Sequence, residues 1–310
     1  MDRAERPVRR WPWIAAAVLL GLVAAIWAIL PDGGAARIER RADCYNPSQV
    51  PRIETLADGR KAMRLRVLLW NVEGLPWPIR SGRGPKLAAI ADWIAARRKA
   101  GLGPDILILH KAFIPGASRI PVAAGFATIV PGPALGAKRD LPAAAPPAGY
   151  AESAHWWKGE GLGKWLDGGL YVATDLPVAS AAREAFGLNS CAGYDCLSNK
   201  GAERLALQLP GAPEPLYLFN THRNSREPAK VGIERAETAH ALQTGENDAF
   251  LADLPPATAM IAAGDFNNYR RGDRSGRFAG DSAFRLAGKG AGFAARPAAN
   301  GASATAPASS

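Results

Sequence analysis

Polar side chains follow four apolar runs of the sequence, at the points where each run ends. Asn71 follows LRVLLW, Lys111 follows PDILILH, His222 follows PLYLFNT, and Asp265 with Asn267 follows ATAMIAAG. Carboxylate and amide oxygens are the ligands that a hard cation such as magnesium prefers. A phosphoryl group that gains charge is stabilised by fixed donors such as histidine. Singly, each residue is explained by turn capping or a structural hydrogen bond; together, at the ends of buried strands, they indicate a candidate site.

Lys111 is the least expected of these residues. Ile106 to Leu109 form a continuous apolar run, which is typical of a strand that is buried on both faces. Burying an ammonium group beyond such a strand costs several kcal/mol unless an anion meets it. We therefore expect Lys111 to face Asp265 or a bound phosphate.

The elements that position these residues alternate between strands and helices. LRVLLW is a predicted strand, and Pro85 opens a helix in which Leu87, Ile90, Trp93 and Ile94 share one face. PDILIL is the next strand. Further strands are predicted in GGLYVATDLPVAS, GAERLALQL, PLYLFNTH and ATAMIAAG, with a helix in EPAKVGIERAETAHALQ and a loop over 131–149. This order predicts a layered α/β domain over 63–290, followed by a low-complexity, disordered tail over 291–310.

The amino terminus has a different character. Residues 11–30 form an apolar run without a charge, long enough to cross about 30 Å of hydrocarbon as a helix. Four arginines precede it, so we expect a basic cytoplasmic segment (1–10), a transmembrane anchor (11–30), a tether (31–62) and a domain in the periplasm or outside the cell. A cleaved signal peptide is the alternative.

The net charge indicates which classes of partner the protein favours, and the cysteine spacing bears on metal binding and disulfide formation. The net charge of +10 and the pI of about 9.8 favour anionic partners such as phosphate esters, nucleic acid or an acidic membrane, although a generally basic soluble surface explains them equally. Cys44, Cys191 and Cys196 have no zinc-type spacing. Cys191 and Cys196 are close enough in sequence for a disulfide in an oxidising compartment, and three free thiols are the alternative.

Three tryptophans gather in HWWKGEGLGKWLDGG, at Trp156, Trp157 and Trp165. Packing of a long loop is the favoured interpretation, because tryptophan clusters more often pack than bind ligands. The alternative is an aromatic surface that contacts lipid.

Five segments resemble, in order, the motifs of the endonuclease/exonuclease/phosphatase superfamily: WNVEGLP, PDILILHKAF, GGLYVAT, NTHRNS and GDFN. The segment YDCLSNKGAERLALQL is similar to one in neutral sphingomyelinases, in which an Asp and a Lys form a switch near the site; here these are Asp195 and Lys200, the latter followed by Gly201. The resemblance implies a four-layer sandwich of two packed mixed β-sheets flanked by helices. It also implies magnesium-dependent hydrolysis of a phosphodiester.

The resemblance assigns a role to each matched residue. His222, Asp265 and Asn267 would be catalytic; Asn71, Lys111, Lys200 and Asp195 would bind substrate or phosphate. Magnesium would be held by Asn71 and Asp265, with Glu73 as a relocated ligand. A phospholipid is the expected substrate class, with nucleic acid as the alternative.

Two departures from the family pattern put turnover in question. Lys111 stands where the family has its metal-binding Glu, and no histidine follows residue 268, where only Asp273 and Asp281 remain for the family's Asp-His pair. We therefore expect weak magnesium binding. Three hypotheses follow: a membrane-anchored phosphodiesterase of sphingomyelinase type, an inactive module that binds phosphate or a lipid head group, and a coding change at residue 111 with a frameshift beyond residue 268.

Overall fold

The protein is an α/β protein with mixed β-sheets, as the order of predicted elements indicated. The structure, a computed structural model, describes residues 37–255 and 258–268, together with the backbone of two short strands at 285–286 and 294–296. All of these belong to one compact unit, Gly34–Ser310. No helix among them is long and apolar enough to span a membrane, and the expected anchor at 11–30 lies outside the described residues.

The first sheet has five strands and carries two of the candidate residues. Its order is β1 (Glu39–Arg40), β6 (Thr128–Pro131), β7 (Tyr171–Thr174), β5 (Ile106–Ala112) and β4 (Val67–Gly74). β4 and β5 are parallel, whereas the other pairs are antiparallel. Parallel neighbours need a crossover, and helix α2 (Arg83–Lys99) provides it. The predicted strand, helix, strand unit is therefore confirmed.

The second sheet has six strands and carries the other candidates. Its order is β12 (Arg285–Leu286), β13 (Ala294–Arg296), β11 (Met260–Asp265), β10 (Leu216–His222), β9 (Gly201–Leu207) and β8 (Val178–Ala185). β10 and β11 are parallel and are connected through helix α5 (Ile233–Leu251). β13 lies within the segment expected to be disordered, where it pairs antiparallel with β11.

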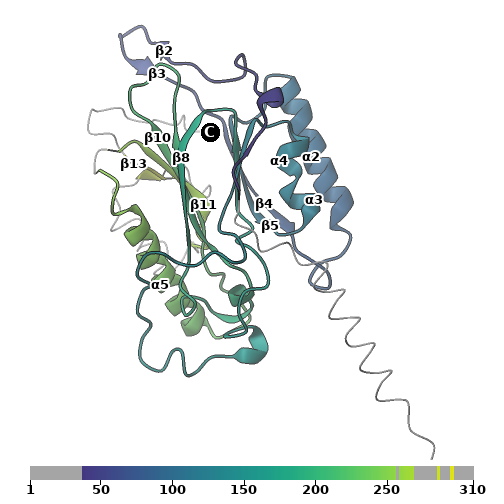
Figure 1. Ribbon diagram of the computed structural model, residues 1–310, viewed down its shortest axis with the longest axis vertical. Coiled ribbons are helices and arrows are strands. Elements are labelled where there is room, and N and C mark those ends of the chain that lie inside the picture. The colour runs from purple at the N-terminus through teal and green to yellow at the C-terminus, as the bar shows by residue number, and fades with distance from the viewer. Residues whose placement is uncertain (1–36, 256–257, 269–284, 287–293, 297–310) are drawn as a thin grey trace, which may run out of the picture. The chain divides into compact units, whose positions relative to one another are not determined.

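Three apolar clusters define the layers. Ile106 and Ile108 of β5 pack against Leu205 and Leu218 of the second sheet, so the two sheets face each other. The alternate residues of β5 pack with α2 instead, and α5 packs on the outer face of the second sheet. Figure 1 shows α2 to α4 on one side of the paired sheets and α5 on the other. The continuous apolar run of β5 is explained by this burial on both faces.

The shorter elements connect these layers. They are η1 (Ala42–Cys44), β2 (Glu54–Thr55), β3 (Lys61–Ala62), α3 (Pro115–Ser118), α4 (Ile120–Ala123), η2 (Trp156–Lys158) and η3 (Gly193–Leu197). Part of the expected tether belongs to the domain: β1 pairs with β6, and Val50 is buried in the cluster between the sheets. The sequence PDGGAARIERRAD did not predict this strand, because an edge strand of two residues is too short to show an alternation of apolar and polar side chains.

Candidate functional site

The layer between the two sheets changes from apolar to polar at one end. Strand residues alternate between faces, so the residues that face the opposite sheet form short series: Leu69 and Asn71 on β4; Ile106, Ile108 and His110 on β5; Leu205 and Glu203 on β9; Leu218, Asn220 and His222 on β10; and Ala263 and Asp265 on β11. The apolar members hold the sheets together. The polar members meet at one end, where we place the candidate site.

Four of the predicted site residues are in contact there. Asn71 donates a hydrogen bond from Nδ2 to Oδ2 of Asp265 over 3.0 Å, and Nε2 of His222 lies 3.6 Å from the same oxygen. The main-chain N–H of Asn267 donates to Oδ1 of Asp265 over 3.3 Å. One carboxylate oxygen of Asp265 thus accepts from the Asn71 side chain and the other from the main chain of Asn267, while the neutral His222 ring lies beyond hydrogen-bond distance.

Asp195 and Lys200 extend the cluster through His222. The Lys200 ammonium donates to Asp195 over 3.0 Å and to the main-chain carbonyl of Arg223 over 3.2 Å, and its Nζ lies 3.3 Å from Nε2 of His222. Burial and then the Lys200 charge hold the pKa of His222 well below its ordinary value. A neutral ring accepts at Nε2, so His222 is bonded to Lys200 as an acceptor.

The same contact explains the charge of Asp195. Burial raises the pKa of its carboxyl, but the Lys200 ammonium and hydrogen bonds outweigh burial and lower the pKa below its ordinary value. The Asp195 carboxyl is thus ionised at neutral pH. The main-chain N–H of Ser225 also donates to Asp195. The Asp and Lys that the motif singled out are brought together with His222.

Lys111 lies beside the site without pairing with Asp265. It is half-buried, and no ion pair of Lys111 with another described residue is present within 4.0 Å. Its charge nevertheless contributes, after burial and the charge of Lys200, to lowering the pKa of both His110 and His222. The expected pairing with Asp265 is not found, because Asp265 is already bonded to Asn71.

An irregularity in the sheet places Lys111 there. The register of β4 and β5 shifts between Asn71 and Gly74, which is a β-bulge. Lys111 has φ 53°, Glu73 has φ 49°, and Asn267 has φ 50°. Non-glycine residues seldom adopt this left-handed region, and such strain concentrates at functional sites. Three strained residues at one end of the sheets therefore mark the same place as the polar cluster.

The described residues do not fit a magnesium site. Asp265 is the one carboxylate of the expected ligand set that lies in the cluster, and the Glu73 side chain is exposed, with its main-chain N–H bonded to Asn71. No group of three or more His, Cys, Asp or Glu side chains within the described part of the chain is arranged to hold a metal ion. Mg²⁺ requires several oxygen ligands, and two lysines add positive charge.

His110, Asn220 and Glu203 were missed by the sequence analysis. All three are completely buried at the polar end of the inter-sheet layer. Each interrupts an apolar strand pattern, in ILILHKA, LYLFNTH and GAERLAL. A polar residue that faces inward in a strand requires a partner. That interruption is the signal that would have found them.

The cysteines and tryptophans also have defined positions. Cys191 and Cys196 form a disulfide with Cα atoms 5.2 Å apart, which closes the loop that carries Asp195, while Cys44 is free.

Trp156, Trp157 and Trp165 are 64%, 57% and 52% exposed. The favoured interpretation of these tryptophans as loop packing is therefore wrong.

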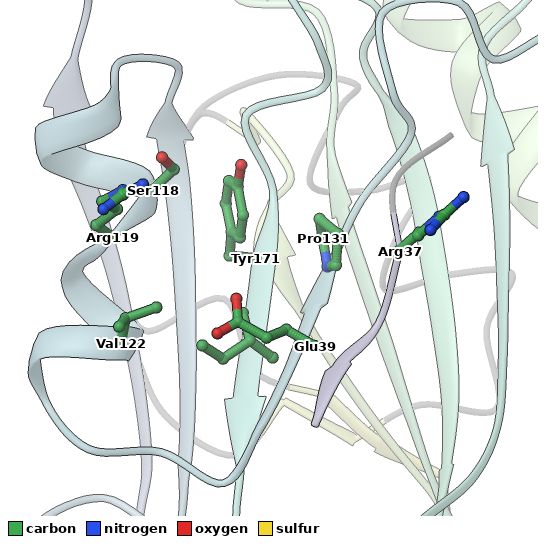
Figure 2. Close-up of a pocket in the computed structure, with 8 residues that line it drawn as sticks. Arg37, Glu39, Ser118, Arg119, Val122, Pro131 and Tyr171 are labelled. Carbon is green, nitrogen blue, oxygen red and sulfur yellow. The ribbon is translucent and has the colours of Figure 1, made fainter. Parts of the chain in front are cut away.

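Two cavities lie away from the site. One, of about 310 Å³, is on the outer face of the first sheet and is lined by Arg37, Glu39, Ser118, Arg119, Val122, Ile129, Pro131 and Tyr171. Figure 2 shows Tyr171 between Ser118 and Pro131, with Arg37 extending away from them. Another, of about 260 Å³, lies near Pro104 and Asp105, where β5 begins. Neither contains a predicted site residue.

Comparison with solved structures identifies the class of fold. The chain resembles a β-hairpin deletion mutant of beta toxin from Staphylococcus aureus, with 18% identity over 72% of this chain and 74% of that chain and a TM-score of 0.54. It resembles sphingomyelinase C from Streptomyces griseocarneus, with 23% identity over 72% and 71% of the two chains and a TM-score of 0.53. No protein-family model and no curated protein matches the chain.

At these identities the likeness establishes the fold. It confirms the fold that the resemblance of the five motifs implied: the chain has the fold of beta toxin and sphingomyelinase C.

Proposed function

We propose that the chain binds the phosphate group of a phosphodiester, with a phospholipid head group as the preferred ligand, at the polar end of the inter-sheet layer. The observation that supports this most directly is the composition of the site. Asn71 donates to Asp265, Lys200 pairs with Asp195 beside His222, and the charges of Lys111 and Lys200 both act on His222. Ammonium and amide donors suit phosphate oxygens, and charge-assisted hydrogen bonds are the stronger ones.

Magnesium-dependent hydrolysis is a weak activity of this site in our proposal. A two-charge cation is repelled by Lys111, the Asp195 carboxylate is already paired with Lys200, and no group of three or more metal-ligating side chains is present in the described part of the chain. In addition, no histidine follows residue 268 to supply the family's Asp-His pair. The site therefore has the donors for binding an anion, whereas two positions that the resemblance assigns to catalysis, the metal-binding Glu and the His of the Asp-His pair, are not matched in the given sequence.

The full chain should bind inorganic phosphate and phosphocholine, with only a small gain in phosphodiester hydrolysis when Mg²⁺ is added. Calorimetric titration measures binding, and a panel of sphingomyelin, a chromogenic phosphodiester and an oligonucleotide, each with and without Mg²⁺, measures turnover. Robust Mg²⁺-dependent cleavage of any of them would refute the proposal. Tighter binding of the oligonucleotide than of phosphocholine would favour the nucleic-acid alternative.

The exposed tryptophans support a lipid ligand. Aromatic side chains exposed at this level are favoured at membrane interfaces, where the ring is buried and the indole N–H stays hydrated. Trp156 and Trp157 also contact each other edge to face, with centroids 6.0 Å apart, so they present a joint surface. Lys158 stands next to them, with its ammonium donating to the main-chain carbonyl of Lys230.

Replacing Trp156, Trp157 and Trp165 together by alanine is expected to weaken binding to phosphatidylcholine micelles about tenfold, which is on the order of 1.4 kcal/mol. Binding of free phosphocholine should not change, because it reports on the polar cluster alone. Trp93→Ala is the matched control, since Trp93 is 46% exposed but lies on α2. Equal micelle binding by the triple variant and the wild type would exclude this surface as a lipid contact.

A further inference from the structure

A chain of buried hydrogen bonds runs between the two sheets and ends at Asp265. Nδ2 of Asn220 donates to Oε1 of Glu203 over 2.8 Å. Nε2 of His110 lies 2.8 Å from Oδ1 of Asn220, and the main-chain N–H of Asp265 donates to Nδ1 of His110 over 3.0 Å. The chain links strands β9, β10, β5 and β11, and Glu203, Asn220 and His110 are each completely buried.

The main-chain N–H of Asp265, at the end of this series of hydrogen bonds, determines which group donates and which accepts in each of them. A main-chain N–H is always a donor, so Nδ1 of His110 has to be an unprotonated acceptor. The remaining ring proton of neutral His110 is then on Nε2, which donates to Oδ1 of Asn220. That contact orients the Asn220 amide, so its Nδ2 faces Glu203, which accepts. One backbone group thereby sets the tautomer of His110 and the orientation of Asn220.

His110 also contacts the other side of the site. Its ring stacks on the ring of His222, with centroids 5.4 Å apart and planes 6° from parallel. It is followed directly by Lys111 in β5. A single buried side chain thus contacts the main chain of Asp265 and the ring of His222, in the residue directly before the strained Lys111.

We propose that His110 is a positioning residue for the phosphate site, and that Asn220 and Glu203 orient it. Preorganised donors bind an anion better than donors that have to be ordered first. Loss of these hydrogen bonds should therefore weaken phosphate binding without removing a group that touches the ligand. This inference rests on the proposed function for its effect on binding, whereas the tautomer of His110 can be tested without any ligand.

The first test is a nuclear magnetic resonance measurement on the full chain labelled with ¹⁵N-histidine, in which four histidines give signals. We expect His110 at neutral pH to carry its proton on Nε2, with Nδ1 unprotonated. Asn220→Leu removes both the acceptor and the donor at the centre of the chain. In that variant Nδ1 of His110 should stay unprotonated, because the Asp265 N–H still donates to it, whereas the Nε2 proton loses its acceptor, so the His110 and His222 signals should shift. A proton on Nδ1 of His110 in the wild type, or unchanged His110 and His222 signals in the variant, would overturn the proposal.

The second test is the affinity for inorganic phosphate, which should fall about tenfold in Asn220→Leu and in His110→Leu. His110→Gln keeps one acceptor and one donor at the same place, so its affinity should stay within about threefold of the wild type. If the leucine variants do not fold, His110→Gln still tests the proposal. A folded His110→Gln variant whose phosphate affinity falls about tenfold would contradict a positioning role.

Asn247→Leu is the matched control, because Asn247 is buried and bonds to Thr221, which is not one of the hydrogen-bonded residues that lead to Asp265. It should leave both the His110 tautomer and the phosphate affinity unchanged; a loss equal to that of Asn220→Leu would assign the effect to general packing and overturn the proposal. If the wild type binds no phosphate, the proposed function fails, and the tautomer measurements still decide whether the hydrogen-bond chain exists.

Discussion

Lys111→Glu is expected to strengthen Mg²⁺ binding by at least about 30-fold, which corresponds to about 2 kcal/mol. The substitution replaces a cation by an anion beside the site of Asp265, and it supplies a second carboxylate of the kind that Mg²⁺ prefers. Phosphate binding should weaken for the same electrostatic reason. Calorimetric titration of the full chain with Mg²⁺ and with inorganic phosphate measures both changes.

Two further variants separate charge from coordination. Lys111→Gln removes the ammonium without adding a carboxylate, so we expect a smaller gain in Mg²⁺ affinity. Lys99→Glu makes the same charge change at an exposed position in the last turn of α2 and should have no measurable effect. Equal gains from Lys111→Glu and Lys99→Glu would show that Lys111 does not face the site.

Turnover should recover much less than metal binding in Lys111→Glu. The family's Asp-His pair has no histidine to match it beyond residue 268, so a bound metal alone does not supply a base. Hydrolysis of sphingomyelin by the variant at a rate typical of an enzyme, on the order of 1 s⁻¹ or more, would contradict this reasoning. It would indicate that a described residue, such as His222, performs the proton transfer.

The sequence predicted which polar residues come together between the sheets, because these residues lie at strand ends. Asn71, His222 and Asp265 each follow an apolar run, and the packing of two sheets brings the ends of β4, β10 and β11 together. The continuous run before His110 likewise predicted a strand buried on both faces, which β5 is. These predictions needed only the alternation of side chains and the rule that buried strands are apolar.

Backbone conformation and partner choice were not predictable in the same way. The bulge at Glu73 and the positive φ of Lys111 have no signature in residue type, since neither residue is Gly or Asn. The pairing of Asp265 with Asn71 rather than Lys111 depends on that conformation. Tertiary contacts also decided the Trp156 region, where a cluster expected to pack against the loop is exposed instead.

Glu203→Gln is expected to stabilise the protein at neutral pH, and this is the second large effect. Burial raises the pKa of the Glu203 carboxyl from 4.5 to about 8, because Arg183 and the Asn220 hydrogen bond offset only part of the desolvation cost. Between these two pH values the folded protein keeps a proton that the unfolded chain has lost. The free energy of unfolding therefore decreases as pH rises through this window, by on the order of 3 kcal/mol at pH 7.

Glutamine matches the shape of protonated glutamate but has no proton to lose. Its Oε1 can accept from Nδ2 of Asn220, as Glu203 does. The variant should thus be more stable than the wild type by on the order of 3 kcal/mol at pH 7 and about equally stable at pH 4. Urea unfolding at pH 4, 5.5 and 7 measures the difference, which should grow with pH.

Glu160→Gln provides a control of opposite sign. Although burial raises the pKa of Glu160, hydrogen bonds from Arg235 and from the main chain of Gly193 lower it below its ordinary value. Its charge therefore stabilises the fold above pH 4.5, and the Gln variant should lose stability at pH 7. If Glu203→Gln also lost stability at pH 7, Glu203 would be ionised in the fold and paired with Arg183. The hydrogen-bond chain to His110 would then begin at a buried anion, and its strength would depend on Arg183 as much as on Asn220.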